Sequence, residues 1–201
     1  GESMFTNKLI GFLAILIVGL MALLVWAATS GNPEILMAAA GGNLTKVKTI
    51  LAATPDQISA SDKDGWTALH YAANAGQSPV VEFLLSKGAD VNSKTCEKQS
   101  LFKPERESGW TVLHMAANVG NDKLAKILLA KGADVNARTS NSHTPLHMAC
   151  IDGHKTTIEL LLAGGADVKI MDSKGCTPLK YLIIRKNDDL AELLRKHGAV
   201  E

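Results

Sequence analysis

Three histidines in matching sequence contexts are the residues of this chain best suited to metal or proton chemistry. His70, His114 and His147 each follow a leucine and each lie three residues after a threonine. Imidazole is the commonest metal ligand in proteins and titrates near neutral pH. The other three histidines show no metal-ligand spacing. Because the same context recurs three times, each histidine is expected to have the same role in its own copy, and the three are not expected to share one metal site.

The cysteines and carboxylates give no catalytic or metal-binding pattern. Cys96, Cys150 and Cys176 lack the Cys-x-x-Cys spacing of zinc sites, and their odd number argues against a disulfide framework. Cys150 stands where other copies of the motif have alanine, which predicts a small buried core residue. The sequence shows no Ser-His-Asp order, carboxylate pair or glycine-rich phosphate loop. We therefore expect no enzyme activity, no cofactor and no metal.

One motif recurs along the chain and contains these histidines. GWTALHYAA at residues 65–73 returns as GWTVLHMAA at 109–117, as HTPLHMAC at 143–150 and, in degenerate form, as GCTPLKY at 175–181. Thr111, Thr144 and Thr177 are 33 residues apart, whereas Thr67 and Thr111 are 44 apart, which is one period plus eleven residues. A fixed period near 33 predicts stacked copies of one supersecondary unit.

This repeat resembles that of the ankyrin family. The Thr-Pro-Leu-His core, the alanine pair and the Leu-Leu-x-x-Gly-Ala-Asp-Val-Asn block at 84–92 and 128–136 carry the resemblance, which covers roughly residues 34–200. It implies an all-α solenoid of about five helix-turn-helix units, with a hairpin-like finger before each first helix. In this family the repeated histidine bonds within the loop network. Units stacked roughly 10 Å apart also keep these histidines too far from one another for one ion, whose bonds to nitrogen are about 2 Å long.

Local signals place the elements of each unit. The first unit lacks the Thr-Pro-Leu-His motif, as a terminal cap does, and is expected to have helices over residues 35–42 and 44–52. In the second unit, Gly65 is expected to supply a positive φ in the finger, and Thr67 is expected to cap the first helix. The fourth unit has Ser142 where the other fingers have glycine, which predicts a less regular finger.

Residues 9–28 form an uncharged apolar stretch that predicts a membrane segment. A helix of that length, at about 1.5 Å per residue, spans roughly 30 Å, the thickness of the hydrocarbon core of a bilayer. We prefer an uncleaved transmembrane signal anchor to a cleaved signal peptide, whose apolar core is usually about 7–15 residues. Residues 1–8 then form a tail that begins with an apparent expression-tag scar. Residues 29–33 form a linker to the repeat domain at 34–201.

The distribution of charge predicts on which side of the membrane the repeats lie. Lys8 precedes the apolar stretch, and residues 27–45 contain no lysine or arginine. The positive-inside bias therefore predicts a cytoplasmic tail and repeats on the exoplasmic side, which is the periplasm in a bacterium. Cleavage would instead release the repeats into the periplasm. The net charge of +1 argues against a nucleic-acid partner.

The resemblance implies that a protein partner binds on a concave face made of finger tips and first helices. Trp66 and Trp110 stand at equivalent positions of neighbouring fingers, and tryptophan is enriched at binding hot spots. The alternative is that the two indoles pack on each other or on the neighbouring finger. The other candidates taken from the family's binding positions are Lys63, Asp64, Asn74, Asn118, His143, Ile151, Asp152 and Arg185.

The eleven extra residues fall within 94–108 and lengthen the finger of the third unit. Leu101 and Phe102 are an apolar pair inside a charged stretch. Because such a pair cannot reach the core, it points to a partner contact. A solvated loop is the alternative.

These features predict a non-enzymatic module, tethered to the membrane, that binds one protein partner. Some bacterial ankyrin proteins of the cell envelope have a similar layout. They act as immunity proteins against a secreted toxin or as accessory proteins of a redox enzyme such as catalase. The alternative is a structural subunit of a larger membrane complex, in which residues 9–28 pack against the helices of other subunits.

Overall fold

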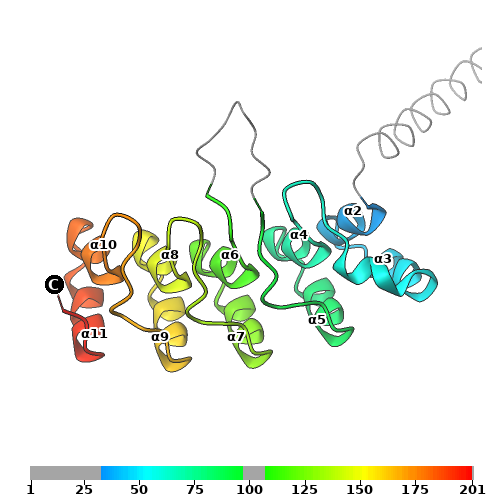
Figure 1. Cartoon of the computed structure of the whole chain (residues 1–201). Helices are drawn as coiled ribbons and strands as arrows, with labels where there is room; N and C mark the ends of the chain where they lie inside the picture. Colours follow the sequence, from blue (N-terminus) through cyan, green and yellow to red (C-terminus); the bar gives the residue numbers. More distant parts are fainter. Residues whose placement is uncertain (1–32, 97–106, 201) are drawn as a thin grey trace, which may run out of the picture.

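The computed structural model describes residues 33–96 and 107–200, which form a row of helix pairs. Figure 1 shows the first helix of each pair on one side of the row and the second helix on the other. A 3₁₀ helix, η1, covers Pro55–Ser59 after the first pair. The α-helices of these residues are α2 (Glu34–Ala40), α3 (Leu44–Ala53), α4 (Ala68–Asn74), α5 (Ser78–Ser86), α6 (Val112–Asn118), α7 (Asp122–Ala130), α8 (Pro145–Asp152), α9 (Lys155–Ala163), α10 (Pro178–Ile184) and α11 (Asp188–Lys196).

The all-α prediction is confirmed for the described residues, none of which lies in a strand. The helices of the first unit were expected over residues 35–42 and 44–52, and they differ from these ranges by at most two residues at each end. The fingers are closed by a few main-chain hydrogen bonds each rather than by strands. One of them holds an isolated bridge between Ser61 and Thr67.

The recurring Thr-x-x-His pattern builds the start of the first helices. Thr67, Thr111 and Thr144 each cap a helix, accepting a hydrogen bond from the backbone N–H of the histidine three residues on. The imidazole bonds back to the N–H of the threonine, so that histidine takes the place of the usual Glu or Gln of a capping box. In the last unit Lys180 stands at this position, and only the threonine half of the arrangement is present there.

The core runs along the row between the helices and consists of aliphatic side chains and alanines. Leu113, Leu146 and Leu179 are fully buried, one in each of three successive first helices. Small residues next to them let neighbouring first helices approach closely, and α6 packs against both α4 and α8. Cys150 is fully buried in this layer, which confirms the prediction of a core residue. Burial also raises the pKa of its thiol, so that it stays protonated and unreactive.

The finger of the fourth unit is not less regular than the others, so that this expectation was wrong. Ser142 adopts a positive φ of 62°, close to the 75° of Gly65 and the 74° of Gly175. Its N–H donates to the carbonyl of Thr139 at 2.9 Å, as the N–H of Gly65 does to Asp62 at 3.1 Å. A positive φ is uncommon in residues other than glycine, so this conformation has some energetic cost in serine.

Within residues 33–96 and 107–200, no helix has both the length and the apolar character that crossing a membrane requires. The expected membrane segment at 9–28 lies outside the described residues, as do the tail at 1–8 and residues 29–32 of the expected linker.

Candidate protein-binding face

Each finger is hydrogen-bonded to the next one through main-chain atoms. The N–H of Cys96 donates to the carbonyl of Asp64, that of Ser140 to Ser108 and that of Ser173 to Asn141, at 2.8–2.9 Å. The two partners of each bond are 32 residues apart in every case. The described parts of the fingers therefore form an edge along the row, and residues on neighbouring fingers have a fixed spacing.

The repeated histidines lie beneath this edge and connect the units. His70, His114 and His147 are fully buried. In each, Nδ1 accepts a hydrogen bond from the N–H of the capping threonine. Nε2 lies 3.1–3.3 Å from a carbonyl of the next finger, on Trp110, His143 or Cys176, to which it donates. Both ring nitrogens are therefore used inside the fold, and the role of these histidines is structural.

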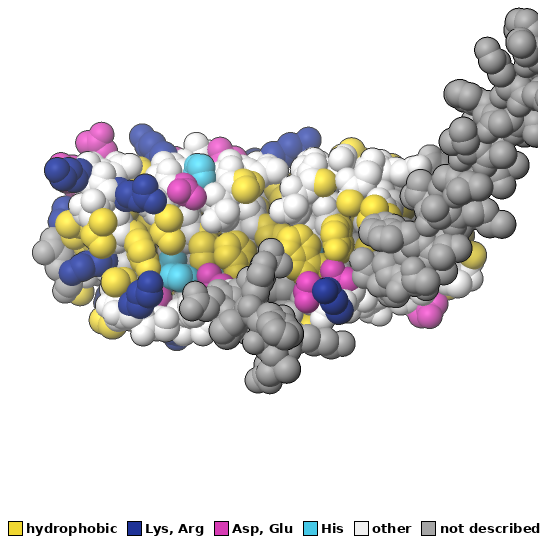
Figure 2. Space-filling view, turned by 90° about the horizontal axis from the view of Figure 1, so that it is seen from above, with side chains coloured by type: hydrophobic (Ala, Val, Ile, Leu, Met, Phe, Trp, Pro, Cys, Tyr) yellow, Lys and Arg dark blue, Asp and Glu magenta, His cyan; other side chains and the backbone are white. Residues whose placement is uncertain are grey.

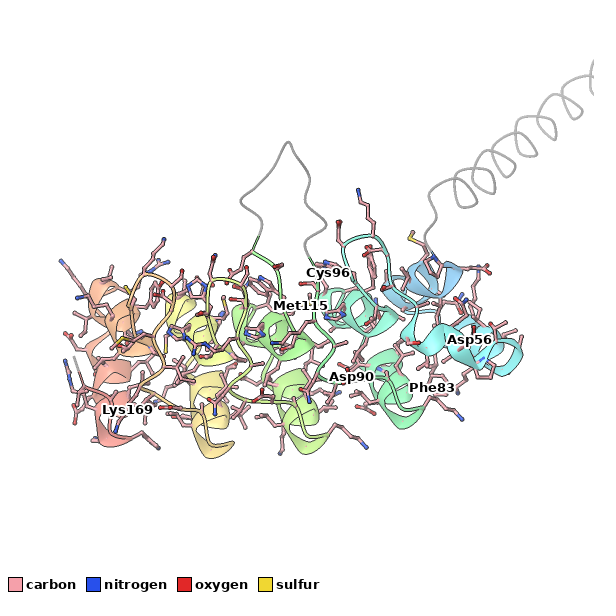
Figure 3. The ribbon with its side chains drawn as sticks, in the orientation of Figure 1. Asp56, Phe83, Asp90, Cys96, Met115 and Lys169 are labelled. Carbon is pink, nitrogen blue, oxygen red and sulfur yellow. The ribbon has the colours of Figure 1, made fainter. Side chains whose placement is uncertain are left out.

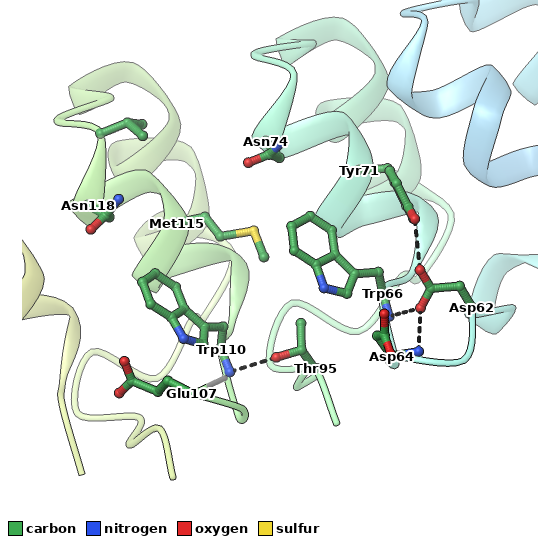
Figure 4. Close-up of a pocket in the computed structure, with 11 residues that line it drawn as sticks. Asp62, Asp64, Trp66, Tyr71, Asn74, Thr95, Glu107, Trp110, Met115 and Asn118 are labelled. Atoms are coloured by element: carbon green, nitrogen blue, oxygen red, sulfur yellow. Dashed lines mark hydrogen bonds between the residues drawn. The ribbon is translucent and has the colours of Figure 1, made fainter. Parts of the chain in front are cut away.

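A groove of about 600 Å³ opens between the second and third fingers. Figure 4 shows the indoles of Trp66 and Trp110 on its two sides, with the side chain of Met115 between them. Asn74 and Asn118, at the ends of α4 and α6, line one rim. Asp64 and Glu107 line the other rim. The groove is therefore apolar in its middle and acidic along the finger edge.

The two tryptophans are half-buried and keep part of each indole at the groove. Trp66 contacts the ring of Tyr71, with centroids 5.4 Å apart, and Trp110 contacts that of His114 at 6.0 Å. Each indole is thus held from within its own unit. This packing fixes the indoles in place and limits the conformational entropy that a partner must remove when it binds.

A hydrogen-bonded pair that no sequence motif predicted, Asp62 and Tyr71, supports the groove. Oδ1 of Asp62 accepts from the N–H groups of Asp64 and Trp66, both at 2.9 Å, and Oδ2 accepts from the hydroxyl of Tyr71 at 2.7 Å. Burial, followed by this hydrogen bond, raises the pKa of Tyr71 to about 12. Asp172 and Tyr181 repeat the arrangement in the last unit with the same separation of nine residues. That repeated spacing is the signal from which the pair could have been found.

A comparison of the chain with known protein families identifies the family of this fold. The model for ankyrin repeats (three copies) matches residues 13–95 and 113–200. The chain belongs to the ankyrin repeat family. Ankyrin repeats generally mediate protein–protein interactions, and the fold is typically non-enzymatic.

Curated relatives share short ankyrin segments with this chain. A palmitoyltransferase (akr1) of Schizosaccharomyces pombe is 42% identical over 60 residues, which are 30% of this chain and 9% of the relative. The human NAD-capped RNA hydrolase NUDT12 is 44% identical over 52 residues, or 26% of this chain and 11% of the relative. The human 26S proteasome non-ATPase regulatory subunit 10 is 42% identical over 53 residues, or 26% and 24%. The chain therefore spans less than a quarter of the length of each relative.

A charged cluster fixes the end of the long third finger to the fourth ankyrin unit. Nδ1 of His143 lies 2.7 Å from Oε1 of Glu107, which also accepts from the hydroxyl of Thr139. Nε2 of His143 lies 3.3 Å from a carboxylate oxygen of Asp172. The hydrogen bond to Glu107 raises the pKa of His143 above its ordinary value. Burial alone would raise the pKa of Glu107, but hydrogen bonds from His143 and Thr139 hold it below its ordinary value.

The groove includes five of the residues that the sequence proposed for partner binding: Asp64, Trp66, Asn74, Trp110 and Asn118. Lys63 is exposed on the second finger beside it. His143 belongs to the charged cluster of the next finger. Ile151 and Asp152 lie at the end of α8, and Arg185 follows α10, so that these three are on the same side of the row but outside the groove. Leu101 and Phe102 lie outside the described residues.

Proposed function

We propose that this ankyrin repeat chain is a non-enzymatic binding module that holds a protein partner on the face formed by its fingers and first helices. The observation that carries the proposal is the groove between Trp66 and Trp110, because two indoles on neighbouring fingers are presented at one opening. Figure 2 supports it by showing a band of hydrophobic side chains along the face seen from above. Such a band on a rigid scaffold suits a protein partner.

Replacing Trp66 by alanine tests this proposal. A library of random peptides displayed on phage is selected against the full chain in a non-ionic detergent. We expect binders whose affinity falls at least about 30-fold with Trp66→Ala, the loss typical of a hot-spot residue. Trp110→Ala should have a similar effect. Affinity is measured by fluorescence anisotropy, and thermal unfolding confirms that each variant is folded.

Phe83→Ala is the matched control. Phe83 is also a half-buried aromatic residue, but Figure 3 places it on α5, away from Met115 of the groove. Its removal should leave affinity unchanged within about twofold, the range of contacts outside a hot spot. Binders that are indifferent to both tryptophans, or the lack of any binder, would contradict the proposal.

We propose further that residues 9–28 tether the repeats to a membrane, with the repeats on the exoplasmic side. The support is the uncharged apolar stretch and the position of Lys8 before it. In bacterial cells the full chain should resist carbonate extraction from membranes, while a chain without residues 9–28 should be released. Added protease should cut the repeats in spheroplasts but not in intact cells. Release of a shortened chain would instead favour cleavage, and protection in spheroplasts would reverse the orientation. An envelope immunity or accessory protein would have this arrangement.

A further inference from the structure

The groove between Trp66 and Trp110 is lined by charged side chains of one sign. The residues that line it within the described part of the chain include three carboxylates, Asp62, Asp64 and Glu107, and no lysine, arginine or histidine. Figure 2 shows acidic side chains, with a basic one among them, beside the hydrophobic band near the middle of the face, and further lysine and arginine side chains toward the end formed by α10 and α11. The lining side chains are therefore acidic, although the exposed Lys63 lies beside them, and a partner group placed there should be positive.

The three carboxylates differ in how many of their oxygens accept hydrogen bonds within the described residues. Asp62 uses both oxygens inside its own finger, as described above. Glu107 makes its bonds with Thr139 and His143 through Oε1, and none of the hydrogen bonds among the described residues uses Oε2. For Asp64, only main-chain bonds are found within the described residues: its N–H donates to Asp62, and its carbonyl accepts from Cys96. As far as the described residues go, the Asp64 carboxylate and one oxygen of Glu107 therefore remain as acceptors for a ligand.

The apolar part of the groove suits a flat cation. Indole has the strongest cation–π attraction of the aromatic side chains, and a guanidinium can stack on it while its N–H groups bond to carboxylates. Tyr71 donates its hydroxyl to Asp62, which directs that polar group into the finger. Met115 supplies a polarisable surface between the indoles. A lysine ammonium is more strongly hydrated and lacks a planar face, so that it fits this surface less well.

We propose that the groove between Trp66 and Trp110 binds an arginine side chain of an extended segment of the partner protein. The inference rests on the proposed function and specifies the chemistry of its partner. The guanidinium lies against the indoles and bonds to the carboxylate of Asp64 and to Oε2 of Glu107. Asn74 and Asn118, on the opposite rim, bond to the main chain of the segment.

A pair of short peptides tests the charge requirement directly. The probes are acetyl-Gly-Arg-Gly-amide and the same peptide with citrulline, which keeps the shape of arginine but is neutral. Binding to the full chain in non-ionic detergent is followed through the indole N–H signals of Trp66 and Trp110 in NMR spectra. We expect the arginine peptide to bind at least 10-fold more tightly than the citrulline peptide, with a lysine peptide in between, and to weaken as salt is added.

Reversal of one charge at the rim is the second arm of the test. Asp64→Lys should weaken the arginine peptide at least 10-fold, since it removes an acceptor and adds a repelling charge. Glu82→Lys makes the same change in net charge on the exposed surface of α5 and should have no effect. Because no described residue bonds to the side chain of Asp64, its replacement should leave the fold intact, which thermal unfolding checks.

Several results would overturn the assignment. Equal affinity for the arginine and citrulline peptides, tighter binding of lysine than of arginine, or full binding by Asp64→Lys would each do so. Library binders that depend on Trp66 but are not enriched in arginine would overturn it while the proposed function stands. Residues 97–106 include Lys98, Lys103 and Arg106. If replacing these three by serine raised the affinity for the arginine peptide at least 10-fold, the occupant would be the chain's own segment, and the partner assignment would fail.

Discussion

Lowering the pH from 7 to 5 is expected to reduce the free energy of unfolding by roughly 4 kcal/mol through two buried histidines. Burial lowers the pKa of His114 and of His147 to about 4, from an ordinary value of 6.5. At pH 5 the unfolded chain binds a proton at each of these residues, whereas the folded chain does not. Each histidine therefore accounts for a loss of about 2 kcal/mol.

The hydrogen bonds explain why these imidazoles resist protonation. Nδ1 of His114 accepts from the N–H of Thr111, and that of His147 accepts from Thr144. A proton on Nδ1 would break this bond and would place a charge in the core. Since the pKa is lower in the folded chain, the stabilisation is fully present above about pH 6.5 and is lost as the pH falls toward 4. Burial lowers the pKa of His70 as well, so that it acts in the same direction.

The charged cluster of Glu107, His143 and Asp172 changes the free energy of unfolding in the opposite direction as the pH falls from 7 to 5. The pKa of His143 is raised, so its stabilisation is present below pH 6.5 and is lost as the pH rises through its folded pKa. It therefore offsets part of the loss between pH 7 and 5. The pKa values of Glu107 and Asp172 are held below their ordinary values of 4.5 and 3.8, so that these acids destabilise the fold only at still lower pH.

Urea unfolding followed by circular dichroism at pH 7, 6 and 5 measures these contributions. The double variant His114→Gln, His147→Gln should flatten the dependence on pH, because glutamine can complete the capping box and does not titrate. His143→Gln is the matched control and should make the decline steeper, since it removes the opposing contribution. An unchanged slope in the double variant would show that these two histidines do not cause the loss.

The sequence predicted several features that depend on contacts within one unit, although not the bond between Tyr71 and Asp62. Thr67 caps α4, Gly65 takes a positive φ and Cys150 is buried, because each is determined by residues a few positions away or by the alanine pattern of the repeat. The positions of Trp66 and Trp110 on neighbouring fingers also followed from the period. Both residues line the same groove, as residues of one binding face should. The repeat pattern does not specify the partner, because it describes only the scaffold.

Features that join two units were harder to predict. Glu107 lies at the end of the long finger, where the eleven extra residues interrupt the repeat, and its partner His143 is 36 residues away. Nothing in the period aligns these two residues. Within a single finger, the expectation for Ser142 was wrong because serine stands where the other fingers have glycine, yet its N–H bonds to the carbonyl of Thr139 and it adopts the same positive φ.

Gly65→Ala is expected to destabilise the fold by about 3 kcal/mol, since two effects act together. Gly65 has a φ of 75°, and a Cβ there would lie 2.6 Å from the main-chain nitrogen of Cys96 on the next finger. The first effect is the strain of a left-handed conformation in alanine, and the second is a collision with backbone that cannot rotate away. The backbone movement would also weaken the bond between the N–H of Cys96 and the carbonyl of Asp64.

The equivalent glycines of other fingers separate the two effects. Gly175 has a φ of 74° but no atom within 4 Å of a Cβ, so Gly175→Ala should cost only about 1 kcal/mol, from strain alone. Gly109→Ala should fall between them, because its Cβ would lie 3.3 Å from the backbone of the next finger. Urea unfolding gives the three values, and equal losses would show that contact between fingers does not matter.

The same series connects the spacing of the fingers to binding. Asp64 and Thr95 both line the groove, and both adjoin the contact that Gly65→Ala would disturb. The variant should therefore weaken arginine-peptide binding at temperatures where it is still folded, although Gly65 does not line the groove. Gly175→Ala lies two fingers beyond Trp110 and should leave the affinity unchanged. A loss of affinity only with Gly65→Ala would mean that the close approach of neighbouring fingers holds Trp66 and Trp110 at the distance that the guanidinium requires.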